Sequence, residues 1–388
     1  MAVGAVDKPP PTTDTKLTSG RTIDAPEALE RGRHCVGLPD VLAAHDRIAA
    51  HIHRTPVLTC RSLDALLSFQ GRIYFKVEAL QKTGSFKIRG ACNAIFRHVG
   101  NGVGDGRSVA VVTHSSGNHA QAVALASSLA GGNCRATIVM PRDSPRQKLD
   151  AVKSTYGAEV VLCASDPLSR EKVCDEISAE KRRVGGADVL FVHPSDDPDV
   201  IAGQGTVCVE MVEQCREMQA GTPDVFIIPV GGGGLASGNC VALRGMLGDA
   251  VKIVLAEPAR MADAKRSFDS GHLQGHRPSD TLDSVTDGLK TILGPNTWPI
   301  VRDLADDIMT VSEEEILRAT KNVWERMKIL IEPSAGVGVA VALSRDFAQK
   351  YGGVGVTVGV VLCGGNVDVL KISKLISELP SQCKKSGI

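Results

Sequence analysis

The chain has 388 residues, a length that predicts roughly two or three domains. Its 44 Lys and Arg residues balance 44 Asp and Glu residues, so the formal net charge is zero. This balance argues against a nucleic acid or an anionic membrane held by bulk charge. Hydrophobic residues make up 43% of the chain and charged residues 23%, which are ordinary proportions for a globular protein with a large core.

Eleven cysteines are scattered without a C-x-x-C pair, a pattern typical of neither a disulfide framework nor a zinc module. The pattern favours a reducing compartment, and we expect a cytoplasmic protein. No run of about 18 apolar residues occurs, so no transmembrane helix is expected. Residues 1–37 combine a triple proline with acidic residues and lack the apolar segment of a signal peptide. We predict a disordered N-terminal tail there.

From Val41 onwards, short runs rich in Val and Ile alternate with segments of helical periodicity. Such alternation predicts parallel strands buried between helices, which is the α/β class. The predicted strands are Ile73–Val77, Ser108–Thr113, Ala136–Met140, Glu159–Leu162, Asp188–Val192, Asp224–Val230, Lys252–Ala256 and Val356–Leu362. The predicted helices are Asn118–Leu129, Pro145–Tyr156, Val200–Met218, Leu235–Leu247 and Glu313–Met327.

Lys87 lies between Phe86 and Ile88, where a helical segment begins. Apolar surroundings disfavour the charged form of an amine and make it a better nucleophile and base. Lys87 therefore suits a covalent bond to a carbonyl group, although a surface lysine at a helix start is the commoner case. The segment Thr113–His119 joins a strand to a helix with small polar residues, which suit either a bound carboxylate or simple helix capping.

Four consecutive glycines, Gly231–Gly234, join a predicted strand to a predicted helix. Their N–H groups and the positive end of the helix form a cradle suited to a phosphate. The same segment also fits the dinucleotide fingerprint G-x-G-x-x-A at Gly231, Gly233 and Ala236. Glu257 ends the next strand about 20 residues later, where that fingerprint has a ribose-binding acid. From these residues alone, an NAD-binding oxidoreductase is an alternative.

Taken together, the motifs resemble the fold type II family of pyridoxal 5'-phosphate (PLP) enzymes, in its serine/threonine dehydratase group. The resemblance extends from about His45 to Asp368. The matching segments are His53–Leu58, Lys82–Gly90, His114–His119, Ile201–Thr206, Gly231–Gly234, Asn296–Pro299, Trp324–Lys328, Glu332–Pro333 and Gly364–Asp368. The resemblance implies a tryptophan synthase β-like fold of two α/β domains with PLP between them. Residues 38–108 and 189–388 would form the large PLP-binding domain, and residues 109–188 a small inserted domain.

The family's site residues carry over to matching positions of this sequence. Lys87 would hold the cofactor covalently and, with Ser116 on the opposite face, would act as the catalytic acid and base. The other implied cofactor contacts are Asn118, Gly231, Gly232, Gly233, Gly234, Leu235 and Cys363. The implied substrate contacts are Ser115, Ser116, Gly117, His119 and Arg170. Cys363 would face the pyridine nitrogen, where racemases of the family usually have Ser and some dehydratases have Cys.

The resemblance also implies ligands away from the reacting centre. Glu257 and Asp263, with the backbone carbonyl of Met261, match the family's divalent-cation loop, which suits Mg²⁺, Ca²⁺ or Mn²⁺. The positions that match an activating ATP site are Lys82, Thr83, Gln121, Tyr156, Lys328 and Asn366. Cys60 and Arg61 replace serines found there in related animal enzymes, which leaves activation by ATP open. A homodimer is implied by the family as well.

The implied activity is racemisation of serine, with accompanying β-elimination of serine to pyruvate and ammonia. Asp196 and Asp197 add negative charge near the site, which disfavours aspartate as a substrate. A dehydratase of serine, threonine or 3-hydroxyaspartate without significant racemisation is the alternative within the family. Outside this reaction class, two hypotheses stay open: the NAD-binding oxidoreductase, and a catalytically silent relative that binds an amino acid or ATP.

Overall fold

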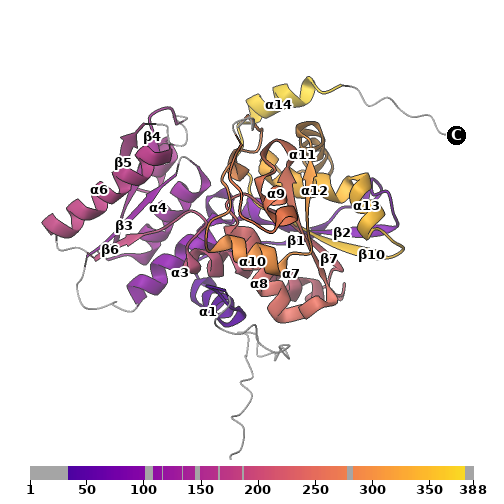
Figure 1. Ribbon diagram of the computed structural model, residues 1–388, viewed down its shortest axis with the longest axis horizontal. Coiled ribbons are helices and arrows are strands. Elements are labelled where there is room, and N and C mark those ends of the chain that lie inside the picture. Colours follow the sequence, from indigo (N-terminus) through magenta and orange to yellow (C-terminus); the bar gives the residue numbers. More distant parts are fainter. Residues whose placement is uncertain are drawn as a thin grey trace, which may run out of the picture.

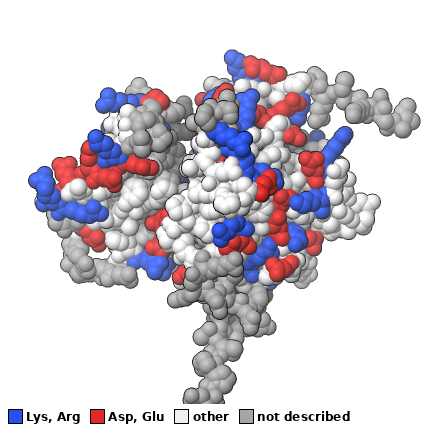
Figure 2. Space-filling view, in the orientation of Figure 1, with Lys and Arg blue, Asp and Glu red and all other residues white. Residues whose placement is uncertain are grey.

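The structure, a computed structural model, describes residues 34–100, 108–115, 117–132, 134–144, 149–164, 167–185, 188–277 and 283–380. These residues form two sheets, each covered by helices, which lie beside one another (Figure 1). The predicted α/β class is therefore confirmed. Figure 2 shows basic and acidic side chains interspersed over the visible face, in line with the balanced composition. Within the described ranges, no helix is both long and apolar enough to cross a membrane.

The first sheet has six strands in the order β1-β2-β10-β7-β8-β9. Their bounds are β1 Val57–Thr59, β2 Gly71–Val77, β10 Val356–Leu362, β7 Val225–Pro229, β8 Lys252–Pro258 and β9 Asp307–Val311. All neighbours are parallel except β1 and β2, which are antiparallel. The sequence analysis missed β1 and β9, because the first has three residues and the second carries polar residues at a sheet edge.

The second sheet has four parallel strands in the order β5-β4-β3-β6. Their bounds are β5 Glu159–Cys163, β4 Cys134–Pro141, β3 Val109–His114 and β6 Asp188–Phe191. Adjacent residues of β3, Val111 and Val112, belong to two different apolar clusters. Since successive side chains of a strand point to opposite faces, both faces of this sheet are buried. One cluster contains residues of α3 and α4, and the other contains Cys174 of α6.

The helices between these strands supply the rest of the core. Their bounds are α1 Leu38–Ile48, α2 Arg61–Asp64, α3 Lys87–Gly100, α4 Asn118–Ala130, α6 Pro167–Gly185, α7 Pro198–Glu217, α8 Gly234–Leu247, α9 Asp263–Ser270, α10 Thr297–Leu304, α11 Glu313–Met327, α12 Pro333–Leu343, α13 Arg345–Tyr351 and α14 Val369–Ser377. Short 3₁₀ turns are Glu78–Leu80, Lys82–Gly84, Gly248–Ala250, Ala259–Met261 and Asp287–Leu289. Helix α12 packs across β10, β7, β8 and β9, and α3 packs against both α4 and α7.

Two sequence-based expectations change at their boundaries. The last four residues of the predicted tail belong to the folded protein, because Val36 is only 4% exposed and joins the main core. His34 Nε2 also lies 3.1 Å from Asp303 Oδ2, and residues 1–33 lie outside the described ranges. The segment expected to be helical at Pro145–Tyr156 is helical over residues 149–155, with a π-helical turn at residues 151–155; residues 145–148 are not described.

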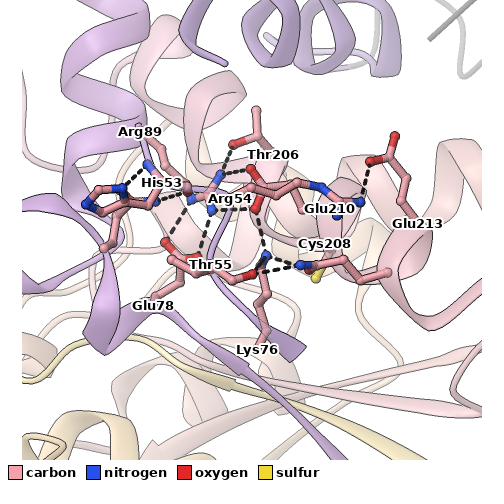
Figure 3. A network of polar contacts seen from close by, with 12 residues as sticks. His53, Arg54, Thr55, Lys76, Glu78, Arg89, Thr206, Cys208, Glu210 and Glu213 are labelled. Atoms are coloured by element: carbon pink, nitrogen blue, oxygen red, sulfur yellow. Dashed lines mark hydrogen bonds and ion pairs between the residues drawn. The ribbon is translucent and has the colours of Figure 1, made fainter. Parts of the chain in front are cut away.

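A buried group of four charged residues connects α3 to the first sheet and to α7 (Figure 3). The Arg89 guanidinium donates to the carboxylates of Glu78 and Glu210 over 2.8 Å. Lys76 Nζ lies 2.6 Å from Glu210 Oε2 and donates to the Thr55 carbonyl over 2.8 Å. Each of the four charged side chains is at most 3% exposed, and two positive charges balance two negative ones.

This network predicts a large difference between two arginine substitutions. Arg89→Met should lower the free energy of unfolding by about 3–5 kcal/mol, because it leaves two buried carboxylates short of a partner. Arg54 pairs with Glu213 and Glu217, but its side chain is 45% exposed. Arg54→Met should therefore cost less than about 1 kcal/mol. Urea unfolding of both variants measures this difference, and equal losses would contradict the assigned role of Arg89.

Candidate active site

The Lys87 amine lies at the start of α3, between the ends of the two sheets. Its Nζ donates to the carbonyl of Pro194 over 2.7 Å and lies 5.2 Å from the centre of the Phe86 ring. Burial of the amine lowers the pKa of Lys87 to about 8, although Cys363 and Glu332 act in the opposite direction. The amine is therefore partly neutral near neutral pH, as a nucleophile or a proton acceptor must be.

The C-terminal end of β10 forms one wall beside this amine. The carbonyl of Cys363 accepts a hydrogen bond from the N–H of Phe86, and Ser85 pairs with Gly364 in an isolated β-bridge. The Cys363 side chain is buried, and burial followed by the charge of Glu332 raises its pKa well above the ordinary thiol value. Cys363 is therefore a neutral thiol, which cannot supply a negative charge to a partner atom.

The glycine loop Gly231–Gly234 connects β7 to α8 and has no room for side chains. A Cβ on Gly232 would lie 2.5 Å from Ser195 Oγ, and Gly233 adopts a φ of 85° that favours glycine. The Gly232 carbonyl accepts a hydrogen bond from Thr297 Oγ1 over 3.1 Å, which fixes the loop further. The loop thus presents bare backbone at the N-terminus of α8, a helix of 14 residues, and this arrangement suits an anionic group.

The segment between β3 and α4 contains most of the predicted substrate contacts. Gly117 N–H donates to Ser115 Oγ over 3.1 Å, and α4 begins at Asn118 with its first N–H groups unused by the helix. The His119 ring is buried, and its Nε2 lies 3.1 Å from both Thr113 Oγ1 and the Val192 carbonyl. Its Nε2 is therefore held within the second sheet, while its buried Nδ1 makes no hydrogen bond to the described residues. Ser116, the predicted opposite-face group, lies outside the described residues.

Asn118 is held from two sides. Its amide nitrogen donates to both carboxylate oxygens of Glu332, at 3.0 and 3.2 Å. Its amide oxygen accepts a hydrogen bond from Asn366 Nδ2 over 2.9 Å, and Asn366 also donates to the Thr83 carbonyl over 2.7 Å. The structure thus brings Asn118, Glu332 and Asn366 together beside Cys363, whose pKa responds to the same Glu332.

Two further histidines lie on the side of the second sheet. The rings of His114 and His193 are 6.1 Å apart in an edge-on arrangement. Burial lowers the pKa of both, and that of His193 falls to about 4 with additional effects from His114 and Lys87. Arg170 of α6 is a predicted substrate contact, and its positive charge also lowers the pKa of His114.

The predicted cation residues lie where β8 leads into α9. Glu257 and Asp263 are 2% and 3% exposed, and Met261 is fully buried between them in the chain. Burial and then the charge of Asp263 raise the pKa of Glu257 to about 8, although the N–H groups of Ala264 and Lys265 donate to its oxygens. Two carboxylates that oppose each other in this way suit a cation with oxygen ligands. Within the described ranges, no three or more His, Cys, Asp or Glu side chains are grouped so that they could bind a metal ion together.

The predicted nucleotide residues are only partly brought together. Lys82 and Thr83 are consecutive, and Thr83 is joined to Asn366 as described. Lys82 Nζ donates to the His51 carbonyl over 2.7 Å. Tyr156 packs at the edge of the core beneath the second sheet, and Lys328 is exposed and donates to the Glu325 carbonyl at the end of its own helix. Gln121 is half-buried on α4, one turn after Asn118.

The sequence matches the family of pyridoxal-phosphate dependent enzymes over residues 48–364, and the chain belongs to this family. Among its relatives, it is 44% identical to a serine racemase from Homo sapiens, over 87% of this chain and 93% of that protein. It is 42% identical to a serine racemase from Dictyostelium discoideum, over 88% and 98% of the two chains. The structure of maize serine racemase is similar to it with a TM-score of 0.77 at 38% identity, covering 89% and 98% of the two chains.

The residues of this chain fit PLP. The cofactor's aldehyde requires a partly neutral amine, which Lys87 provides, and its phosphate requires a cradle of bare backbone such as Gly231–Gly234. Family membership also decides against the dinucleotide interpretation. In agreement, the Glu257 carboxylate faces inward and accepts two backbone N–H groups, so it is not presented to a ribose.

Several residues around the site were given no role from the sequence. Arg89 lies two positions after Lys87 and fixes the helix that carries it, while Glu332 orients Asn118. A usable signal existed for the network: Lys76 and Glu210 interrupt segments that are otherwise apolar, which is typical of buried ion pairs. The contact between Lys87 and the Pro194 carbonyl had no such signal. Every residue has a backbone carbonyl, so the residue type does not indicate which carbonyl accepts a hydrogen bond.

The lowered pKa of Lys87 can be tested in cofactor-free protein. We predict that an amine-selective acylating reagent modifies Lys87 half-maximally at a pH of about 8. Lys350 is a matched control, because its hydrogen bond to Asp307 raises its pKa and should shift its modification to higher pH. Mass spectrometry of the two peptides over a pH series measures both profiles. Coinciding profiles would show that the Lys87 amine is not depressed.

Proposed function

We propose that this protein is a PLP-dependent serine racemase that interconverts L- and D-serine and also eliminates serine to pyruvate and ammonia. The observation that carries the proposal is the Lys87 amine, whose pKa is lowered to about 8 beside a glycine loop suited to a phosphate. The similarity to serine racemases of several organisms supports serine as the substrate.

Racemisation requires proton transfer on both faces of the substrate α-carbon. When bound, PLP supplies an electron sink for negative charge at that carbon. Lys87 takes or returns the proton on one face, because its amine is partly neutral near neutral pH. Ser116 takes or returns the proton on the other face, a role that the family resemblance supports. Ser115 and Gly117, with the N-terminus of α4, would bind the substrate carboxylate.

The neutral thiol of Cys363 bears on the balance between the two outcomes. A neutral partner leaves the pyridine nitrogen without a full positive charge, so the electron sink stays moderate. If the β-hydroxyl leaves before the α-proton returns, the products are pyruvate and ammonia. A dehydratase without significant racemisation is the second candidate, and the observation that favours it is the residue type at Cys363, where some dehydratases of the family have Cys and racemases usually have Ser.

We also propose that residues 109–188 form a small domain that closes over the cofactor, carried on the large domain of residues 38–108 and 189–388. The second sheet supports an inserted domain, since its four strands are consecutive in the chain, although its last strand β6, Asp188–Phe191, extends three residues beyond the expected boundary at 188. Closure would bring Ser116 and Arg170 to the substrate and exclude water from it.

The test is to incubate the purified protein with PLP, Mg²⁺ and L-serine and to measure D-serine and pyruvate together. Both products are expected. Pyruvate alone would favour the dehydratase, and neither product with PLP bound would indicate a silent relative. L-Threonine and L-threo-3-hydroxyaspartate, assayed in parallel, define the substrate range. The sequence predicts little turnover of aspartate from the charges of Asp196 and Asp197, although both carboxylates accept N–H groups of α10 and α7.

Two substitutions separate the proposed proton-transfer groups. Ser116→Ala should reduce D-serine formation from L-serine at least about a hundredfold, since one face loses its acid or base. Lys87→Ala should abolish both D-serine and pyruvate, together with the visible absorbance of the bound cofactor. Unchanged racemisation in Ser116→Ala would disprove its role, whatever its effect on pyruvate.

We further propose a divalent-cation site for Mg²⁺, Ca²⁺ or Mn²⁺ at Glu257, Asp263 and the Met261 carbonyl. ATP would act as an activator at Lys82, Thr83, Gln121, Tyr156, Lys328 and Asn366, and the protein would be a cytoplasmic homodimer. Support for the cation is the pair of buried carboxylates, and support for ATP and the dimer is the family resemblance.

The cation proposal predicts a ligand-dependent stability. At 100 times its Kd, free Mg²⁺ or Ca²⁺ should stabilise the folded protein by about 2.7 kcal/mol, seen as a higher unfolding temperature. Glu257→Gln should remove this increase, while Asp283→Asn, on a side chain that is 97% exposed, should retain it. An equal increase in both variants would place the ion elsewhere.

A further inference from the structure

The turn between β6 and α7, residues 193–197, lies against three parts of the candidate site. The carbonyl of Pro194 accepts a hydrogen bond from the Lys87 amine over 2.7 Å. The side chain and carbonyl of Ser195 fill the space where side chains on the glycine loop would lie, at 2.5 Å from a Cβ on Gly232 and 2.8 Å from one on Gly234. The conformation of this one turn therefore sets the position of the lysine relative to the phosphate cradle.

The far side of the turn is fixed to neighbouring helices. Asp196 Oδ1 accepts the N–H groups of Asn296 and Thr297, at 2.9 and 3.0 Å, where α10 begins. Asp197 caps α7 by accepting the N–H groups of its first turn. Both carboxylates thus accept hydrogen bonds from backbone N–H groups at the starts of α10 and α7. Neither accepts a hydrogen bond from the backbone of residues 193–197.

The turn itself is closed by the ring of His193. Its Nδ1 accepts the N–H groups of Ser195 over 3.2 Å and of Asp196 over 2.7 Å. An acceptor needs a lone pair, so Nδ1 carries no hydrogen and the ring is neutral. Asn side chains close turns in the same manner, with the side-chain oxygen accepting N–H groups two and three residues ahead.

We propose that His193 is a positioning residue of the cofactor site, which as a neutral backbone acceptor holds residues 193–197 so that the Pro194 carbonyl meets the Lys87 amine and Ser195 abuts the glycine loop. The inference rests on the proposed cofactor site and does not depend on which reaction follows. Burial keeps the ring neutral at ordinary pH, and among the described residues the titratable groups that interact with it are His114 of β3, Lys87 of α3 and His119 of α4.

The test compares three substitutions at this position. His193→Leu removes the acceptor but keeps an apolar side chain of similar size, and His193→Asn restores an acceptor at the right distance. His193→Gln has the same amide one methylene farther from the backbone. His98→Leu is the control, because His98 pairs with Asp188 at the other end of β6, where both side chains are partly exposed.

Two measurements are made on each variant. In cofactor-free protein, amide hydrogen exchange at Ser195 and Asp196 should accelerate about tenfold or more in His193→Leu and return towards wild type in His193→Asn. In the complete protein, the Kd of PLP should rise about tenfold in His193→Leu, which is within the effect of the two hydrogen bonds that the substitution removes. His193→Asn and His98→Leu should stay within about threefold of wild type.

Each outcome decides the inference. Wild-type exchange and affinity in His193→Leu would overturn it, and so would an Asn variant as impaired as the Leu variant. If the Leu variant does not fold, the Asn and Gln variants decide, since only Asn should resemble wild type. A wild-type protein that fails to bind PLP would refute the proposed function instead, while the exchange measurement would still test the role of His193.

Discussion

The position of α3 depends on a charge network that is almost completely buried. Arg89 of this helix is joined to Glu78 after β2 and to Glu210 of α7, and Lys76 completes the charge balance. Transferring four ions out of water is costly, and only complete mutual pairing offsets that cost. The arrangement therefore tolerates very little displacement, and the three elements behave as one rigid unit. Lys87 lies two residues before Arg89 on the same helix, so the network also fixes the position of the Lys87 backbone.

Rigid placement matters because the Lys87 amine has to satisfy two opposing demands. Removal from water lowers its pKa and keeps part of it neutral, yet an amine in such a place still needs an acceptor for its hydrogens. The Pro194 carbonyl provides that acceptor without adding a charge that would restore the ordinary pKa. Cys363 and Glu332 act to raise the pKa of Lys87, but the effect of burial is larger. The surroundings of the amine thus supply a hydrogen-bond acceptor and still leave its pKa below the ordinary value.

Much of this could be predicted from the sequence, and the reasons for the exceptions are physical. Strands such as Lys252–Pro258 and Val356–Leu362 are buried on both faces, so an uninterrupted apolar run identified them. Strand β1 has three residues, too few for any periodicity. Lys87 and the glycine loop were found because unusual residue types carry their chemistry. Backbone groups, such as the Pro194 carbonyl and the N–H groups that His193 accepts, carry chemistry that no residue type records.

Helix α3 has one property whose consequence extends beyond the site. Its residues Ile88, Ala91, Cys92 and Ile95 belong to the core that includes α4 and the second sheet, while Arg89 ties the same helix to the first sheet. Helix α3 therefore belongs to the packing of both sheets, and the two sheets are joined through this helix. Helix α4, which packs against α3, contributes small side chains such as Ala120 and Ala124 to this core. Motion of the second sheet relative to the first would then be a shear motion, in which α4 slides along α3. Small side chains allow such a shift without opening a cavity between the helices.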